Sequence, residues 1–138
     1  GKLILKGIQD VEDARMAVQS GADALIVSNH GGRQLDGAQS SIEALPAIVA
    51  EVGSQIEVHM DGGVRSGQDV LKAIALGAKG TYIGRSFLYG LGAMGEEGVS
   101  KCLHIIHNEL DLSMAFCGRT QMAQVDQSIL LPGTFPTA

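Results

Sequence analysis

Four short, mainly apolar runs alternate with longer stretches in which apolar residues recur every three or four positions. The runs lie at residues 3–5, 24–27, 56–60 and 81–83, and glycine follows each of them within a few residues. Short apolar runs bounded by turn residues are typical of buried parallel strands. Since a loop and a helical stretch follow each run, the pattern predicts a parallel sheet with right-handed crossovers.

Capping signals mark where the intervening helices begin. Asp10 can cap a helix that runs to about residue 20, where Gly21 ends it. After the fourth strand we expect a short helix to about residue 91 and a longer one over 96–117, followed by an irregular tail. Two Ser–acid pairs with capping-box spacing predict the other helix starts: Ser40 with Glu43, and Ser66 with Asp69.

A faint internal repeat supports a barrel. Residues 21–27, Gly-Ala-Asp-Ala-Leu-Ile-Val, resemble residues 77–83, Gly-Ala-Lys-Gly-Thr-Tyr-Ile, an offset from 21 to 77 that spans two strand–helix units. Four such units make half of an eight-stranded barrel, which typically needs roughly 250 residues. We therefore predict an α/β fold in which residues 1–138 form half of one (β/α)₈ barrel domain. An open four-stranded sheet is the alternative, and its inner face would need another cover.

The chain enters its first strand directly and without an initiator Met, so we expect its start to be an internal cut and the other half of the barrel to be missing from it. Without that half the inner face of the sheet would be open. We expect side chains such as Leu5, Val27 and Ile83, or their neighbours, to line this apolar face.

Composition narrows the class of protein. Hydrophobic residues make up 45% of the chain and charged residues 18%, which favours a globular fold. The net charge of −5 argues against a nucleic-acid surface, and the lack of a long apolar run argues against a membrane span. Cys102 and Cys117 would lie about 22 Å apart along one helix. They are therefore expected to be reduced thiols of a cytosolic protein; surface association with a membrane is left open.

Chemically unusual residues gather at the predicted strand ends, and in a (β/α)₈ barrel the carboxyl ends of the strands carry the active site. Lys6 ends the first run. It is either a lysine whose stem packs while its head reaches water, or a cation that faces negative charge on a cofactor.

The loop after the second strand has the densest chemistry. Residues 28–36 read Ser-Asn-His-Gly-Gly-Arg-Gln-Leu-Asp. His30 can move a proton near neutral pH, and Arg33 can hold a carboxylate through two hydrogen bonds. The two glycines between them allow a sharp turn. We interpret this loop as catalytic and substrate-binding.

Two glycine-rich loops after the last two strands resemble phosphate sites. Residues 61–67, Asp-Gly-Gly-Val-Arg-Ser-Gly, expose backbone N–H groups just before a helix begins, and Arg65 adds charge. Gly84 and Arg85 repeat the arrangement. Because phosphate sites in these barrels are made by the loops after strands 7 and 8, the chain is predicted to be the C-terminal half of a phosphate-binding barrel, with a further helix and tail.

Other polar residues suggest less. His59 lies within a strand and is interpreted as structural. His104 and His107 have the spacing of neighbours on a helix, but no carboxylate or cysteine pattern completes a metal site, so no metal is expected. Four acidic residues of the last helix are interpreted as a solvated face: Glu96, Glu97, Glu109 and Asp111.

Taken together, these segments resemble the FMN-dependent L-2-hydroxy acid dehydrogenases and oxidases, a family that includes L-lactate dehydrogenase, glycolate oxidase and mandelate dehydrogenase. The resemblance extends from residue 2 to about residue 125. Residues 28–36 carry it most specifically, and residues 5–7, 61–65 and 83–85 add to it.

The resemblance implies FMN as cofactor and a role for each site residue. His30 would be the base and Arg33 would bind the substrate carboxylate. Lys6 would contact the flavin and stabilise its reduced form, and Ser28 would also contact the flavin. The remaining residues would hold the ribityl chain and phosphate of FMN: Asp61, Gly62, Gly63, Val64, Arg65, Gly84 and Arg85.

The implied reaction is oxidation of an L-2-hydroxy acid, with L-lactate expected, to the 2-oxo acid. The implied partners are the N-terminal half, which supplies substrate-binding tyrosines and an aspartate that orients the base, and further copies of the enzyme in a tetramer. Two alternatives stay open: another FMN barrel, such as isopentenyl diphosphate isomerase or a nucleotide dehydrogenase, and a non-catalytic half-barrel. The preferred hydroxy acid and the electron acceptor also stay open, as does whether His30 takes the carbon-bound proton or takes the hydroxyl proton while a hydride is transferred.

Overall fold

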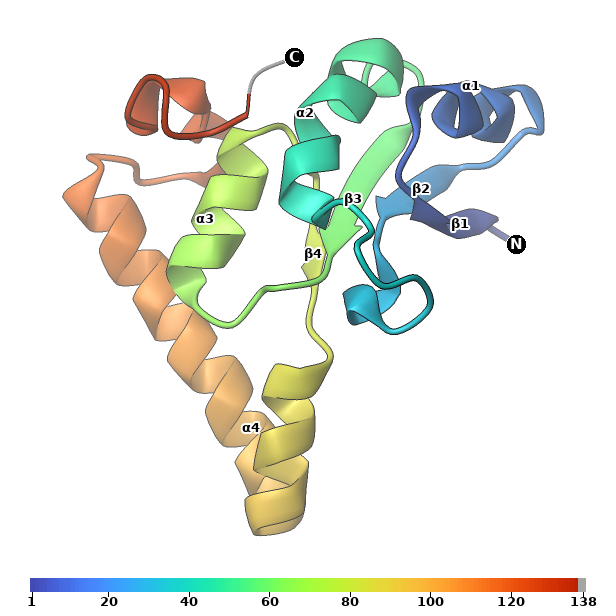
Figure 1. The fold of residues 1–138 in the computed structure, drawn as a ribbon. Coiled ribbons are helices and arrows are strands. Elements are labelled where there is room, and N and C mark those ends of the chain that lie inside the picture. The colour runs from blue at the N-terminus through green and yellow to red at the C-terminus, as the bar shows by residue number, and fades with distance from the viewer. Residues whose placement is uncertain (137–138) are drawn as a thin grey trace.

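The computed structural model describes residues 1–136 and contains a four-stranded parallel sheet (Figure 1). Each strand pairs with the next along the chain, in the order β1 (Ile4–Ile8), β2 (Ala24–Val27), β3 (Glu57–Asp61) and β4 (Thr81–Tyr82). The parallel sheet and the number of strands agree with the prediction from the apolar runs.

Three helices cover one face of this sheet: α1 (Val11–Gln19), α2 (Ser41–Val52) and α3 (Gly67–Ala75). Their small and aliphatic side chains pack against strand residues in a single buried cluster, as the apolar stripes predicted. The predicted caps are confirmed. The Asp10 carboxylate accepts from the Glu12 backbone N–H at 2.7 Å, and both Ser–acid pairs form capping boxes.

The first strand is longer than predicted. It was expected over residues 3–5, with Lys6 at its end, but it continues through Gly7 to Ile8. Gly7 has a φ of +104°, and the pairing register with β2 shifts between Lys6 and Ile8. A glycine tolerates this backbone conformation, so the strand bulges there and goes on instead of ending. Lys6 therefore lies inside β1, one residue before the bulge.

The expected inner-face residues are on the other side of the sheet. Leu5, Val27 and Ile83 all pack in the core beneath the helices. Side chains alternate between the two faces of a strand, so an assignment that is wrong by one residue moves a whole set to the wrong face. The face without helices carries the alternate strand residues, which include the following: Ile4, Lys6, Ile26, His59, Asp61 and Tyr82.

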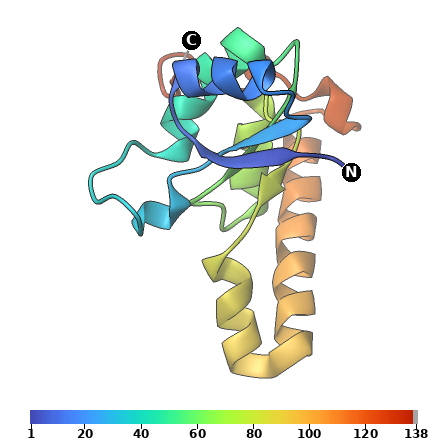
Figure 2. The same ribbon diagram turned by 90° about the vertical axis from the view of Figure 1, so that its right-hand side faces the viewer.

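The last helix, α4 (Arg85–Phe116), is two helices joined by a break at Gly95, as the sequence predicted. Gly95 has φ +62° and ψ −139°, and the two arms run antiparallel, side by side (Figures 1 and 2). The arms touch at two glycines, because a Cβ on Gly90 would lie 2.5 Å from the Gly98 carbonyl oxygen. The second arm packs along α3.

The tail is irregular apart from two short turns of helix, η2 (Met122–Gln124) and η3 (Gln127–Ile129). Val125 of this tail packs with α3 and the end of α4 in a second, smaller cluster. Cys102 and Cys117 are both free and half-buried, rather than fully in the core. None of the helices within residues 1–136 combines the length and the apolar character needed to cross a bilayer.

Candidate active site

The carboxyl ends of the strands surround a hollow of about 410 Å³. All of the predicted site residues except Ser28 line it, although they come from the carboxyl-terminal regions of four different strands and the loops that follow them. Gln34, Tyr82 and Ser86 also line the hollow and were not predicted. The predicted lining residues are Lys6, His30, Arg33, Asp61, Gly62, Gly63, Val64, Arg65, Gly84 and Arg85.

Lys6 is fixed in this hollow by two neighbours. Its Nζ donates a hydrogen bond to the Ser28 hydroxyl at 3.0 Å and forms an ion pair with an Asp61 oxygen at 2.9 Å. The Ser28 side chain is buried and also accepts from the His30 backbone N–H at 3.1 Å. Ser28 therefore lies beneath the hollow and connects the ammonium of Lys6 to the backbone of the loop over residues 28–36, which we call the base loop.

The base loop begins with an unusual turn, η1 (His30–Gly32). His30, Gly31 and Gly32 have φ values of +54°, +69° and +70°. For His30, which has a side chain, this left-handed conformation costs roughly 1–2 kcal/mol. Asn29 offsets this cost locally, since its side-chain oxygen accepts from the Gly31 N–H at 3.0 Å. Asn29 is not among the predicted site residues, although an Asn before a glycine-rich turn is a known turn signal.

The second anchor of the loop comes from a helix. The Asn29 backbone N–H donates to the buried Ser41 hydroxyl at 3.1 Å, at the first residue of α2. Nothing in the local sequence distinguished Ser41, because its role depends on a contact across 12 residues.

The His30 imidazole lies over the bulge of β1. A Cβ built on Gly7 would be only 2.6 Å from His30 Nε2, so the ring occupies space that is available because residue 7 has no side chain. Arg33 follows at the end of the turn, where its backbone N–H donates to the His30 carbonyl at 3.4 Å. Both side chains are exposed, so a small acid in the hollow can reach them.

The start of α3 is not available to an anion, which corrects one part of the phosphate-loop prediction. The Asp69 carboxylate accepts from the backbone N–H groups of Arg65 and Ser66, each at 3.0 Å. Glu109 of α4 accepts from the Gly67 N–H at 2.9 Å. Protein carboxylates thus already occupy this helix end. Glu109 is exposed, as the sequence indicated, but its carboxylate also makes this contact, which was not predicted.

At the start of α4, by contrast, no side chain of the described residues caps the first N–H groups. Its N-cap is Gly84, which has no side chain to accept from the first N–H groups, and a Cβ there would meet nothing within 4 Å. A helix N-terminus with unused N–H groups favours an anion. The Ser86 hydroxyl donates to the Val64 carbonyl at 2.9 Å and joins this helix start to the loop after β3.

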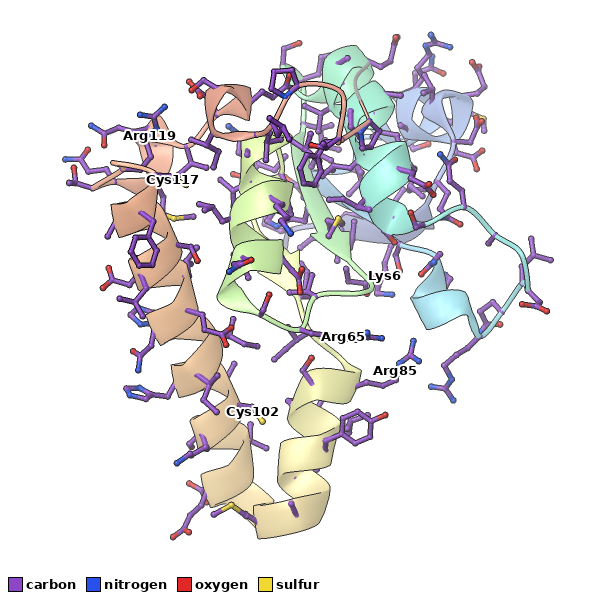
Figure 3. All side chains as sticks on the ribbon, turned by 60° about the vertical axis from the view of Figure 1, so that its left-hand side comes forward. Lys6, Arg65, Arg85, Cys102, Cys117 and Arg119 are labelled. Atoms are coloured by element: carbon purple, nitrogen blue, oxygen red, sulfur yellow. The ribbon has the colours of Figure 1, made fainter. Side chains whose placement is uncertain are left out.

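Three cations converge on the same region. Lys6, Arg65 and Arg85 extend toward it from β1, the loop after β3 and the start of α4 (Figure 3). Asp61 is the acid among them, and one of its oxygens is paired with Lys6. The excess of positive charge and the open N-terminus of α4 together suit a phosphate group.

The remaining histidines lie away from this chemistry. The His59 side chain is mostly buried, its ring centroid is 5.8 Å from that of Tyr82, and its Nε2 is 3.2 Å from a Glu57 oxygen. His104 and His107 are exposed on α4. Within residues 1–136, no three His, Cys, Asp or Glu side chains are grouped so that they could hold a metal ion.

The model of a protein family described as FMN-dependent dehydrogenase matches residues 1–132. The chain belongs to this family. FMN is therefore the cofactor by family membership, and the resemblance of the base loop to this family is confirmed.

Relatives of the chain are hydroxy acid enzymes. It is 54% identical over 130 residues to an L-lactate dehydrogenase of Caulobacter sp. (strain K31), covering 94% of this chain and 34% of that protein. It is 51% identical over 128 residues to the human 2-hydroxyacid oxidase 2, covering 93% and 36%. These relatives favour the hydroxy acid family over the other FMN barrels considered from the sequence.

Solved structures confirm the fold. Mandelate oxidase with 3,3-difluoro-2-hydroxy-3-phenylpropionic acid superposes with a TM-score of 0.88 at 48% identity, over 91% of this chain and 38% of that one. Flavocytochrome b2 with sulfite bound gives 0.89 at 40% identity, over 93% and 34%. The fold of the chain thus corresponds to part of the barrel of these enzymes. The chain spans about a third of the length of its relatives.

Proposed function

We propose that this chain is the part of an FMN-dependent L-lactate dehydrogenase or oxidase that supplies the base, the carboxylate-binding arginine and the phosphate site. The observation that carries the proposal is the meeting of His30, Arg33 and three cations in one hollow. The names of the bacterial relatives support L-lactate as the substrate.

The residues fit FMN in two independent respects. One oxygen of Asp61 is buried and has no hydrogen-bond partner among the described residues, so it can accept from a hydroxyl group such as those of the ribityl chain. Gly63 and the open start of α4 leave room in the hollow that Arg65 and Arg85 line, as a terminal phosphate requires, whereas a Cβ on Gly62 would meet the Ser41 hydroxyl at 2.9 Å.

Each side chain would then have one task. Arg33 would bind the substrate carboxylate through two parallel hydrogen bonds and so orient the hydroxyl-bearing carbon. His30 would accept one of the two protons that the substrate loses. Lys6 would stabilise negative charge on the reduced cofactor, and Asp61 and Ser28 would hold its ammonium in place. FMN, when bound, supplies the acceptor for the two electrons.

A second half of the barrel would complete the site. Within the described residues β1 pairs only with β2 and β4 only with β3, so both edges of the sheet are unpaired. Ile4 and Tyr82, on the face without helices, are exposed to 46% and 42%. Four further strands would pair both edges and cover this face. Assembly into a tetramer, implied by the family resemblance, stays a prediction.

The test is His30→Gln in the complete enzyme, that is, this chain joined to the other half of the barrel. Turnover of L-lactate with a dye acceptor should fall by roughly 10²–10⁴-fold, because general base catalysis typically contributes that much. The flavin absorption spectrum should show that FMN stays bound. Activity of the variant within a few-fold of the wild type would rule out His30 as the base. A higher kcat/KM of the wild type with glycolate or mandelate than with L-lactate would overturn the assignment of L-lactate as the substrate.

A further inference from the structure

Arg85 makes a contact that the phosphate site does not require. Its Nη2 donates to the carbonyl oxygen of Gly31 at 2.8 Å, across 54 residues of sequence. Arg85 is the first residue of α4, next to the open helix end, whereas Gly31 is the residue that follows His30. One guanidinium therefore lies between the phosphate site and the base loop (Figure 3).

The base loop needs support at this point. Its turn contains three consecutive residues with positive φ, and His30 pays a conformational cost there. The local hydrogen bonds of residues 30–32 stay within the loop itself: their N–H groups donate to Ser28 and Asn29, and the His30 carbonyl accepts from the Arg33 N–H. Among the hydrogen bonds of the described residues, the contact from Arg85 is the one that reaches these three residues from a distant element.

The fit between the two groups is close. A Cβ on Gly31 would lie 3.0 Å from Arg85 Nη2, which is tighter than an ordinary contact. The glycine thus leaves the space that the guanidinium occupies. A shift of the guanidinium would release the Gly31 carbonyl, which belongs to the peptide between Gly31 and Gly32, one residue after His30.

We propose that Arg85 is a positioning residue that couples phosphate binding to the geometry of the base. This inference rests on the proposed function, since it takes the hollow as the FMN phosphate site. Arginine has five N–H donors in a planar fork, so it can donate to Gly31 from one nitrogen and to a phosphate from the others. A phosphate that fixes the guanidinium therefore also fixes the Gly31 carbonyl and, through it, His30.

The substitution Arg85→Lys separates attraction of the phosphate from the hydrogen bond to the Gly31 carbonyl. Lysine keeps the positive charge, but its ammonium is a single point charge on a flexible stem and cannot span both partners in the same way. Arg65→Lys is the matched control, because Arg65 lines the same hollow and has no described hydrogen bond to the base loop. Both variants keep the net charge of the site.

The experiment measures backbone hydrogen exchange of residues 28–36 in the complete enzyme, without FMN and at saturating FMN, together with the FMN dissociation constant. Without FMN, Arg85→Lys should raise exchange in this loop about tenfold over Arg65→Lys, as expected for loss of one hydrogen bond from a charged donor. Saturating FMN should protect the loop in the wild type and in Arg65→Lys, and much less in Arg85→Lys. Both variants should bind FMN more weakly.

Kinetics give a second readout. At saturating FMN, Arg85→Lys should lower kcat for L-lactate more than it raises KM, since the base is misplaced while Arg33 remains. Equal loop exchange in the two variants, in either state, would overturn the coupling. Failure of the wild type to bind FMN would instead overturn the proposed function, and the comparison without FMN would still decide whether Arg85 holds the loop.

Discussion

Gly7→Ala should disable the enzyme without unfolding it, because Gly7 is where β1 meets the imidazole of His30, the proposed base. The added Cβ would lie 2.6 Å from His30 Nε2, whereas ordinary contacts begin at 3.4 Å. The ring or the strand must therefore give way by about 0.8 Å, the difference between these two distances. Either movement changes the position of the base relative to Lys6 on the same strand.

The expected magnitudes differ for stability and for catalysis. Alanine at a φ of +104° has a strained backbone, which costs roughly 1–3 kcal/mol of folding free energy. A misplacement of about 1 Å at a catalytic group can reduce the rate roughly 10²-fold. We therefore expect a modest fall in melting temperature and a loss of about two orders of magnitude in kcat for L-lactate.

Gly21→Ala is the control that separates the two effects. Gly21 also has a positive φ, +79°, but a Cβ there would meet nothing within 4 Å, and the residue lies in the turn between α1 and β2. It should lower the melting temperature by a similar amount and leave lactate turnover close to the wild type. If Gly7→Ala retained the turnover of Gly21→Ala, the bulge would not determine where His30 lies, and this reasoning would be refuted.

Two further predictions concern the substrate and the half-barrel. Arg33→Lys should lower kcat/KM for L-lactate about tenfold or more and weaken inhibition by oxalate in parallel, because the charge remains but the two parallel hydrogen bonds do not; unchanged values for both would count against a carboxylate site. Residues 1–138 expressed alone with FMN should associate or aggregate and show no lactate turnover, because Ile4, Tyr82 and the sheet edges are uncovered; a soluble monomer as active as the complete enzyme would refute this.

The sequence was sufficient for the elements that local chemistry determines. Helix starts at Asp10, Ser40 and Ser66 follow from side chains that cap the next few N–H groups, and the break at Gly95 follows from a run of small residues. The site residues could be grouped for a similar reason. In a parallel sheet the carboxyl ends of all strands, and the loops that follow them, lie on the same side. Residues at the ends of four strands must therefore meet there.

Contacts between distant residues were beyond the sequence. The carboxylate of Glu109 caps α3 from 42 residues away, and an exposed helix position gave no sign of it. The bulge at Gly7 depends on pairing with β2, and without it the alternation of β1 could not be followed to its end. The same uncertainty about strand parity put Leu5, Val27 and Ile83 on the wrong face.

The bulge of β1 links two functions that the sequence presents as separate motifs. Lys6 precedes it and extends toward Asp61 and Ser28, and Gly7 within it leaves space for the His30 ring. Ser28 in turn accepts hydrogen bonds from both Lys6 and the His30 backbone. The positions of Lys6, the cation proposed to face the reduced cofactor, and of His30, the proposed base, thus both depend on the bulge at Gly7 and on the buried hydroxyl of Ser28. A change in either should therefore move Lys6 and His30 together.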